Sequence, residues 1–205
     1  ATERKLIAEA SQIEVSFYDD STAEAELIAY DGTTGIAVLS VQKSQLSEDT
    51  QNRVAAATLG SSSALTQGTI VIAIGSPLGE PFSVLTGNVT SSSHEVTAVD
   101  ANYKVISTDI NAGEGGSGAL INLNGEVVGL ILQSFGTEAA QSTVTAIGIT
   151  EIRALLEKLS NGVTPAHLGL EVSTVTSTIA EENKIPKGVY VKNVVQDSPA
   201  NPVRS

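Results

Sequence analysis

The stretch TDINAGEGGSGALINLNGEVVGL, residues 108–130, decides how this chain is interpreted. It places Ser117 among four glycines, at positions 113, 115, 116 and 118, and then enters an apolar strand. A serine in a loop of glycine amides has the composition of a nucleophile with an oxyanion site, because small residues let backbone N–H groups converge. The same composition also fits a relic of such a loop. The rest of the chain must separate these two interpretations.

Short apolar runs occur on both sides of this stretch and predict β-strands. Several alternate polar and apolar residues with a period of two, and turn residues such as Asp31-Gly32 and Asn124-Gly125 separate them. The predicted strands are Ile13–Phe17, Ala25–Tyr30, Ile36–Leu39, Thr69–Gly75, Val84–Thr90, Tyr103–Ser107, Val127–Leu132 and Thr143–Ile149. Strands at short, regular spacing predict a sandwich or barrel. The polar run 44–53 is predicted to be a surface loop.

The pattern changes after residue 149. Ile152, Leu155, Leu156 and Leu159 recur on one helical face, with Thr150 as the expected cap and Asn161-Gly162 as the expected end. A linker at 163–166 is then expected to lead into a second small unit. Its predicted elements are a strand over Leu168–Val172, a helix over Thr178–Asn183 and a strand over Gly188–Val194.

Composition excludes several classes of function. The formal net charge of −12 disfavours binding to nucleic acid or to anionic membrane surfaces. The absence of Cys excludes disulfides and zinc–thiolate sites, and no metal-binding motif is present, so we expect no metal or cofactor. No apolar run is long enough for a membrane helix. Because the sequence starts at Ala1 and contains no Met, we expect it to be a fragment.

Several stretches, in order along the chain, are similar to the HtrA/DegP family of trypsin-fold serine proteases. They are TGIAVLSV (34–41), GTIVIAIGSPLG (68–79), TGNVTS (86–91), the 108–130 stretch, and HLGLEV with IPKGVYVKNVVQDSPA (185–200). The resemblance implies a mainly β, trypsin-like double β-barrel over residues 1–162, with its N-terminal strands partly missing. It also implies the start of a PDZ domain over residues 163–205.

The catalytic triad that the resemblance implies is degraded at each position. A triad needs a serine nucleophile, a His base and an Asp that orients the His. The family's His position falls on Lys5, and its Asp position falls on Gly35. Counting back from Leu120, the serine falls on Gly116; if one deletion is allowed, it falls on Ser117.

Other candidates for the missing groups are weaker. Asp31 fits a turn better than a triad, and the two histidines, His94 and His167, are interpreted as exposed loop residues. A Ser-Lys dyad of Ser117 with Lys5 would need a desolvated lysine, whereas the charged neighbours of Lys5 suggest a wet surface. Gly115 and Gly116 would form the oxyanion loop.

A separate binding activity is implied for the C-terminal part. In PDZ domains a Leu-Gly-Leu-type loop points its amides at the terminal carboxylate of a peptide that adds as a strand. Leu168, Gly169 and Leu170 match that loop. An ordinary strand start is the alternative.

The sequence leads to one main hypothesis and two others. The main one is a catalytically inactive HtrA-like protein that binds peptides or unfolded proteins in cell-envelope protein quality control, on the outer side of a bacterial membrane. The alternative is an active serine endopeptidase using Ser117. A third is a regulatory partner in mixed oligomers with an active relative; the resemblance also implies homo-oligomers, commonly trimers.

Overall fold

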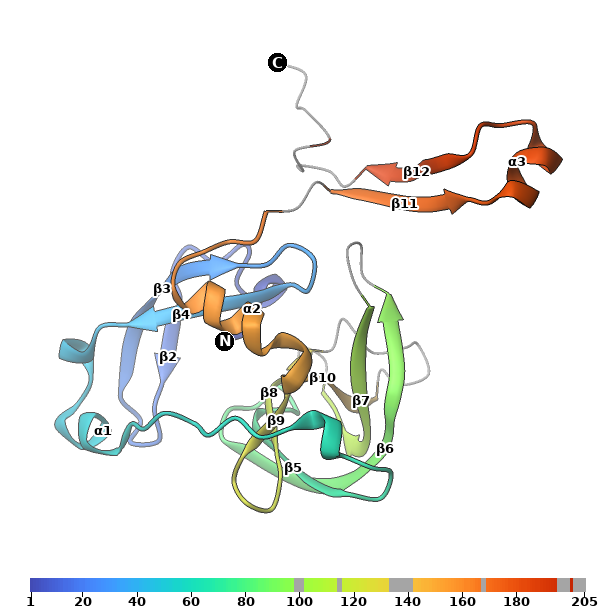
Figure 1. Cartoon of the computed structure of the whole chain (residues 1–205). Helices are drawn as coiled ribbons and strands as arrows, with labels where there is room; N and C mark the ends of the chain where they lie inside the picture. The colour runs from blue at the N-terminus through green and yellow to red at the C-terminus, as the bar shows by residue number, and fades with distance from the viewer. Residues whose placement is uncertain (98–101, 114–115, 133–141, 167–168, 195–199, 201–205) are drawn as a thin grey trace. The chain divides into compact units, whose positions relative to one another are not determined.

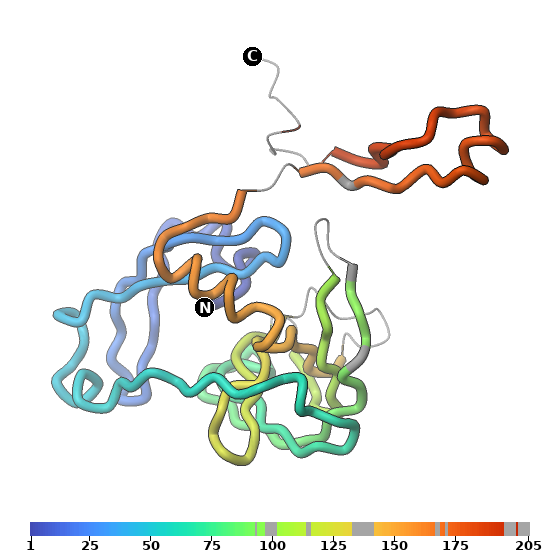
Figure 2. Tube along the Cα trace, in the orientation of Figure 1, coloured from blue at the N-terminus to red at the C-terminus, as the bar shows by residue number. Residues whose placement is uncertain are grey.

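A computed structural model describes residues 1–97, 102–113, 116–132, 142–166, 169–194 and 200. The chain divides into two compact units. Unit 1 contains residues 1–96 and 103–165, and unit 2 contains residues 97–102 and 166–205. Figures 1 and 2 show the course of the chain through the elements of each unit.

The described part of unit 1 is built mainly from β-strands, with two α-helices and three 3-10 turns. Its strands are β1 (Thr2–Glu3), β2 (Glu14–Ser16), β3 (Thr22–Tyr30), β4 (Ile36–Val41), β5 (Ile70–Ser76), β6 (Ser83–Thr97), β7 (Asn102–Asn111), β8 (Ser117–Ile121), β9 (Val127–Leu132) and β10 (Thr143–Gly148). Its helices are the 3-10 turns η1 (Arg4–Leu6), η2 (Lys43–Gln45) and η3 (Ser62–Ala64) and the α-helices α1 (Glu48–Arg53) and α2 (Ile149–Ser160).

Six strands close into a barrel in the order β10-β7-β6-β5-β8-β9. The barrel closes because β9 pairs with both β8 and β10 in antiparallel register. Alternate residues point inward, so Val71 and Ala73 of β5 and Leu120 of β8 are fully buried in the barrel core. The glycine-rich stretch therefore runs into a central wall of this barrel.

The other strands form an open sheet in the order β1-β4-β3-β2. A second core cluster joins this sheet to the outside of the barrel: Ile36 and Val38 of β4 pack with Leu132 of β9 and with Ile152 and Leu159 of α2. Helix α2 contacts both sheets, so the apolar face that its sequence predicts is buried between them.

The structure corrects two predictions about helices. Residues 44–53 contain η2 and α1 instead of a loop, because Ser47 accepts a hydrogen bond from the N–H of Thr50 and acidic residues follow in the first turn. Thr150 is not the cap of α2; Gly148 is, and Thr150 already lies in the helix. The predicted end at Asn161-Gly162 is confirmed, with Gly162 in a left-handed conformation.

Unit 2 contains a two-stranded ribbon and one short helix. Strands β11 (Leu170–Val175) and β12 (Gly188–Val194) pair antiparallel, and α3 (Ser177–Asn183) connects them. The predicted strand at 188–194 is confirmed, and every residue of β12 is exposed. A two-stranded ribbon alone is marginally stable in water.

None of the helices in the described ranges is both long enough and apolar enough to span a bilayer.

Candidate functional site

The glycine loop before β8 is tied to the turn that follows β5. The N–H of Gly113 donates to Pro77 O (2.9 Å), and the N–H of Gly116 donates to Gly113 O (3.0 Å). Residues 114–115, and with them the predicted oxyanion residue Gly115, lie outside the described ranges. Two amides of the loop are therefore occupied by bonds within the protein.

Gly116 has no space for a side chain. A Cβ built on Gly116 would lie 2.3 Å from Pro77 O and 3.1 Å from Gly113 O, and both of these atoms belong to the backbone. Contacts under 3.0 Å essentially never occur for real Cβ atoms. A serine at this position, where counting back from Leu120 places the nucleophile, would require the turn or the loop to move.

Ser117 is the first residue of β8 and is held by pairing on both sides. It lies opposite Ser76 of β5 and Leu132 of β9, and it is half-buried. Its hydroxyl forms no hydrogen bond with any residue in the described parts of the chain. Among the described residues no base is therefore bonded to Ser117, and Ser117 lines a hollow.

The positions predicted for the base and for its orienting acid lie close together. β1 pairs with β4, which puts Glu3 opposite Ile36, and the N–H of Arg4 donates to Gly35 O (2.6 Å). Lys5 Nζ lies 3.2 Å from Glu3 Oε1, and the Lys5 side chain is 51% exposed. The positions predicted for the base and the acid are thus neighbours in the structure, as a triad requires. Lys5 at the first position forms an ion pair, and Gly35 at the second has no side chain.

Glu3 is a residue that the sequence analysis did not single out. Its side chain is only 2% exposed, whereas a glutamate is almost never so buried unless it is paired. The partner Lys5 lies two residues further along, so the sequence itself offers a weak signal for the pair. Burial of Glu3 could not be predicted from the polar run around it.

Gly35 and Asp31 have structural roles in the β3–β4 turn. Gly35 has φ +71°, a left-handed conformation that most side chains avoid. The Asp31 carboxylate accepts bonds from the Thr34 N–H (2.8 Å) and the Thr34 hydroxyl (2.7 Å). The prediction that Asp31 serves a turn is confirmed.

Of the two histidines, only His94 belongs to the described residues. His94 is exposed, as predicted, but it lies within strand β6 and not in a loop. His167 lies outside the described residues. Within the described ranges no three His, Cys, Asp or Glu side chains come together as a metal site would require.

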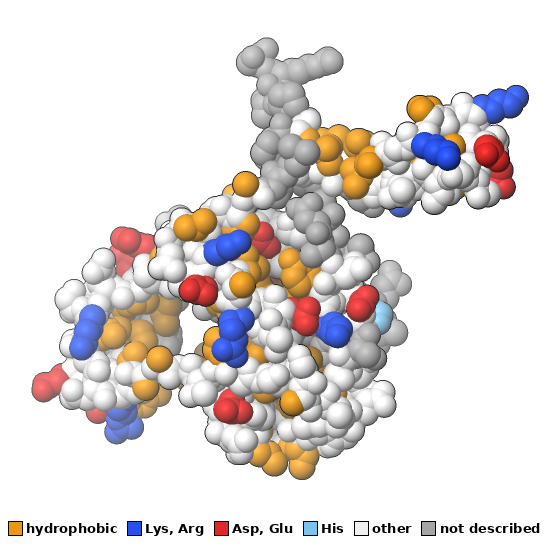
Figure 3. All heavy atoms as spheres, viewed as in Figure 1, with side chains coloured by type: hydrophobic (Ala, Val, Ile, Leu, Met, Phe, Trp, Pro, Cys, Tyr) orange, Lys and Arg blue, Asp and Glu red, His pale blue; other side chains and the backbone are white. Residues whose placement is uncertain are grey.

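A hollow of about 730 Å³ lies between the open sheet and the barrel. Its walls include Val15 and Phe17 on the sheet side and Phe82 and Ser117 on the barrel side. Figure 3 shows apolar side chains inside the lobe formed by β2, β3 and β4. The residues Ile13, Val15, Phe17, Leu39 and Val41 are half-buried, so much of this apolar surface still faces the hollow.

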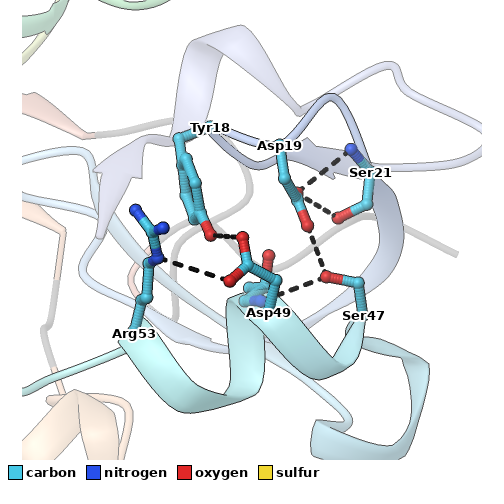
Figure 4. Close-up of polar contacts among 7 residues, drawn as sticks. Tyr18, Asp19, Ser21, Ser47, Asp49 and Arg53 are labelled. Carbon is cyan, nitrogen blue, oxygen red and sulfur yellow. Dashed lines mark hydrogen bonds and ion pairs between the residues drawn. The ribbon is translucent and has the colours of Figure 1, made fainter.

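A polar cluster, shown in Figure 4, fastens the β2–β3 turn to α1. The Asp19 carboxylate accepts from the Ser21 hydroxyl (2.6 Å) and from the Ser47 hydroxyl. The Tyr18 hydroxyl donates to Asp49, which also pairs with Arg53.

The contacts of this cluster shift two pKa values. The hydroxyl donors, Ser21 first and then Ser47, hold the pKa of Asp19 below its usual range. Burial and the bond to Asp49 raise the pKa of Tyr18.

The predicted peptide-binding loop of unit 2 is described only in part. Leu168 lies outside the described residues. Gly169 is buried and has φ +74°, and Leu170 begins β11. A left-handed glycine directly before a strand suits a loop whose amides turn toward a ligand.

The chain is similar to a peptidase family and to bacterial serine proteases. The family described as "Trypsin-like peptidase domain" matches residues 1–130. "Serine protease Do-like HtrA" of Bacillus subtilis (strain 168) is 31% identical over 97% of this chain and 47% of its own length. "Probable periplasmic serine endoprotease DegP-like" of Ectopseudomonas mendocina (strain ymp) is 32% identical over 98% of this chain and 42% of its own length.

Solved structures agree in fold. "HtrA-type protease AlgW with decapeptide" superposes with a TM-score of 0.70 at 28% identity, covering 97% of this chain and 61% of that chain. The predicted mainly β, double-barrel fold class is thereby confirmed. The chain spans about half the length of the curated relatives that it matches.

Proposed function

Because the chain belongs to the family of trypsin-like peptidase domains, we propose that it is an HtrA-like protein that has lost peptide-bond hydrolysis and binds peptides or unfolded proteins. The observation that carries this proposal is the lack of room at Gly116, where a Cβ would meet Pro77 O at 2.3 Å. The loop has adapted to a glycine at the position where the family pattern has its nucleophile.

The amides of the loop support the same conclusion. An oxyanion hole needs N–H donors that are free to point at the developing charge. The N–H groups of Gly113 and Gly116 instead donate to backbone oxygens of Pro77 and Gly113. Of the two predicted oxyanion residues, Gly116 is described, and its N–H would have to leave Gly113 O before it could face a developing charge; Gly115 lies outside the described residues.

The positions predicted for the triad His and Asp are occupied by Lys5 and Gly35. Lys5 Nζ forms an ion pair with Glu3 Oε1 at 3.2 Å, so its amine is engaged by a carboxylate in place of a serine hydroxyl. Gly35 offers no carboxylate. The positions predicted for the base and for its orienting acid thus lack the His and the Asp that a triad requires.

We assign the binding activity to two domains in an envelope setting. The first is the trypsin-like domain over residues 1–162, and the second is a partial PDZ domain over residues 163–205, with Leu168, Gly169 and Leu170 receiving a peptide C-terminus. Relatives are named periplasmic serine endoproteases, which supports a role in cell-envelope protein quality control.

An active serine endopeptidase remains the second candidate, and one observation favours it. Ser117 lines the hollow, and in the described parts of the chain its hydroxyl is not held by any bond. A base from residues outside those parts would be needed to activate it.

The test is labelling of the longest natural form with a fluorophosphonate probe beside a Ser117→Ala control. We expect no labelling of a protein shown to be folded by circular dichroism. Labelling that disappears in Ser117→Ala would refute the loss of catalysis and establish Ser117 as the nucleophile. Capture of a reduced, unfolded carrier protein by the same sample then tests the binding activity.

A further inference from the structure

A cavity of about 220 Å³ lies within unit 1, beside the first turn of α2. Its lining comes from η3 and the residue that follows it, from β6 and β7 of the closed barrel, and from the junction of β10 with α2. Among the described residues it shares no lining residue with the hollow at Ser117. Because one water takes up about 30 Å³ in the liquid, the cavity has room for a molecule of several non-hydrogen atoms.

The walls of this cavity are fixed by bonds between segments that are distant in sequence. The N–H of Ser62 donates to Thr150 Oγ1 (3.0 Å), and the N–H of Thr150 donates to Ser62 Oγ (3.1 Å). The Ser92 hydroxyl donates to Leu65 O (3.1 Å). Gly148 leaves the space that Ser62 occupies, because a Cβ at position 148 would lie 2.6 Å from Ser62 Oγ. A ligand therefore meets a site that is already formed, which lowers the entropy lost on binding.

Two side chains of opposite charge border the cavity. Lys104 of β7 and Glu151 of α2 both belong to the lining, and both are exposed. Among the described residues neither forms an ion pair with the other or with a third group. Lys104 attracts a negative group and Glu151 attracts a positive one. A simple anion or cation would be repelled by one of the two, whereas a zwitterion is attracted by both.

Hydroxyl groups and a buried apolar surface complete the lining. The hydroxyls of Ser62 and Ser63 donate to no group in the described parts of the chain, so each is free to donate to a carboxylate. Leu65 and Ile106 are 8% and 2% exposed and form the buried part of the lining. They offer apolar contact to a small aliphatic side chain.

We propose that this cavity binds a free α-amino acid with a small aliphatic side chain. The ligand's carboxylate lies between the Lys104 ammonium group and the serine hydroxyls, its ammonium group faces Glu151, and its side chain contacts Leu65 and Ile106. A residue at one end of a peptide carries only one of the two backbone charges, so the free amino acid is the better match. The inference goes beyond the proposed function, which assigns no role to these residues.

The experiment uses the longest natural form and L-valine, followed by isothermal titration calorimetry. The matched ligands are N-acetyl-L-valine, which lacks the ammonium group, and L-valinamide, which lacks the carboxylate. We expect L-valine to bind with a Kd of about 1 mM or tighter, and both matched ligands to bind at least about tenfold more weakly. Hydrogen–deuterium exchange should show that L-valine protects residues 62–65 and 148–152.

Two variants locate the binding to the cavity. Glu151→Gln and Lys104→Gln each remove one charge and keep a polar side chain, and each should weaken L-valine binding by about tenfold or more. In Glu151→Gln, N-acetyl-L-valine should bind as well as L-valine, because the group that selects the ammonium is gone. Glu157→Gln and Lys158→Gln are the matched controls, since both side chains are exposed on the same helix and neither borders the cavity. Both controls should bind like the parent protein, and all four variants should keep its circular dichroism spectrum.

Three results would overturn the proposal. Equal binding of L-valine and N-acetyl-L-valine by the parent protein would show a site for any carboxylate. Undiminished binding by both Glu151→Gln and Lys104→Gln would place the amino acid elsewhere. A folded parent protein that binds no L-valine at concentrations well above about 1 mM would refute the site itself.

Discussion

Gly35 is the position predicted for the family's Asp, and Gly116 is one of the two positions, with Ser117, predicted for its Ser, but the surroundings of the two glycines differ. A Cβ on Gly35 would meet no atom within 4 Å, so its only constraint is the left-handed φ of +71°. A Cβ on Gly116 would overlap the backbone of Pro77. Position 35 can therefore accept a side chain, whereas position 116 cannot unless the backbone moves.

We expect Gly35→Asp to cost about 1 kcal/mol or less, because Asp tolerates the left-handed region better than most residues. Gly116→Ser should cost about 1–3 kcal/mol, because the loop or the Pro77 turn must shift. Urea unfolding of the parent protein and of the two variants measures the loss in the free energy of unfolding for each substitution.

Restoring the family residues should not restore the chemistry. The combined change Lys5→His, Gly35→Asp and Gly116→Ser is expected to remain unlabelled by a fluorophosphonate probe, because a serine at 116 overlaps Pro77 O and would displace the loop that must hold it in line with converging amides. A labelled triple variant, or a Gly116→Ser variant as stable as the parent, would contradict this account of the loop.

Among single elements, α1 depends on the polar cluster that joins it to the β2–β3 turn. Asp19 accepts from Ser21 and Ser47, and Ser47 in turn accepts from the N–H of Thr50 at the start of α1. These bonds favour the ionised carboxylate, so the pKa of Asp19 is lowered in the folded state. Its stabilising contribution is therefore full above the unfolded-state pKa of about 3.9 and is lost as the pH falls through the folded-state pKa.

Asp19→Asn should lower the free energy of unfolding at pH 7, and the gap to the parent protein should narrow as the pH falls below about 4. Urea unfolding at pH 7 and at pH 3 measures the two gaps. Asp20→Asn is the matched control, because in the described parts of the chain the Asp20 side chain makes no hydrogen bond and its φ of +61° also suits Asn. An equal effect of both substitutions would refute the role given to the Asp19 bonds.

At the scale of unit 1 as a whole, one apolar cluster makes the open sheet and the barrel a single body. Ile36 and Val38 from the sheet meet Leu132 from the barrel, and Ile152 of α2 packs between them with no exposed surface. Because both the open sheet and the barrel contribute residues to this cluster, a substitution that disrupts it should destabilise both.

Ile152→Ala is expected to destabilise unit 1 by about 2–5 kcal/mol through lost burial and a residual cavity. Hydrogen–deuterium exchange should show protection falling in β3 and β4 and in β6 and β7 together. Leu156→Ala, which removes a partly buried side chain at the edge of the same cluster, should have a smaller effect. Loss of protection in only one of the two sheets would show that they fold independently.

The sequence by itself predicted most of the strands and a sandwich or barrel, because alternation of apolar residues is a local property. The double-barrel class followed from the resemblance to the HtrA/DegP family. Strand β9 at Val127–Leu132 and strand β12 at Gly188–Val194 begin and end at the predicted residues. The helix at α1 carries no apolar period, so a pattern based on periodicity predicts a loop there; its signal is the Ser47 cap.

Only the tertiary structure decided the state of the candidate site. Whether Gly116 has room for a side chain depends on Pro77, and whether Glu3 is buried depends on the pairing of β1 with β4. These features arise from contacts between distant segments, which no local spacing encodes, because the chain is free to bring different segments together until the cores are packed.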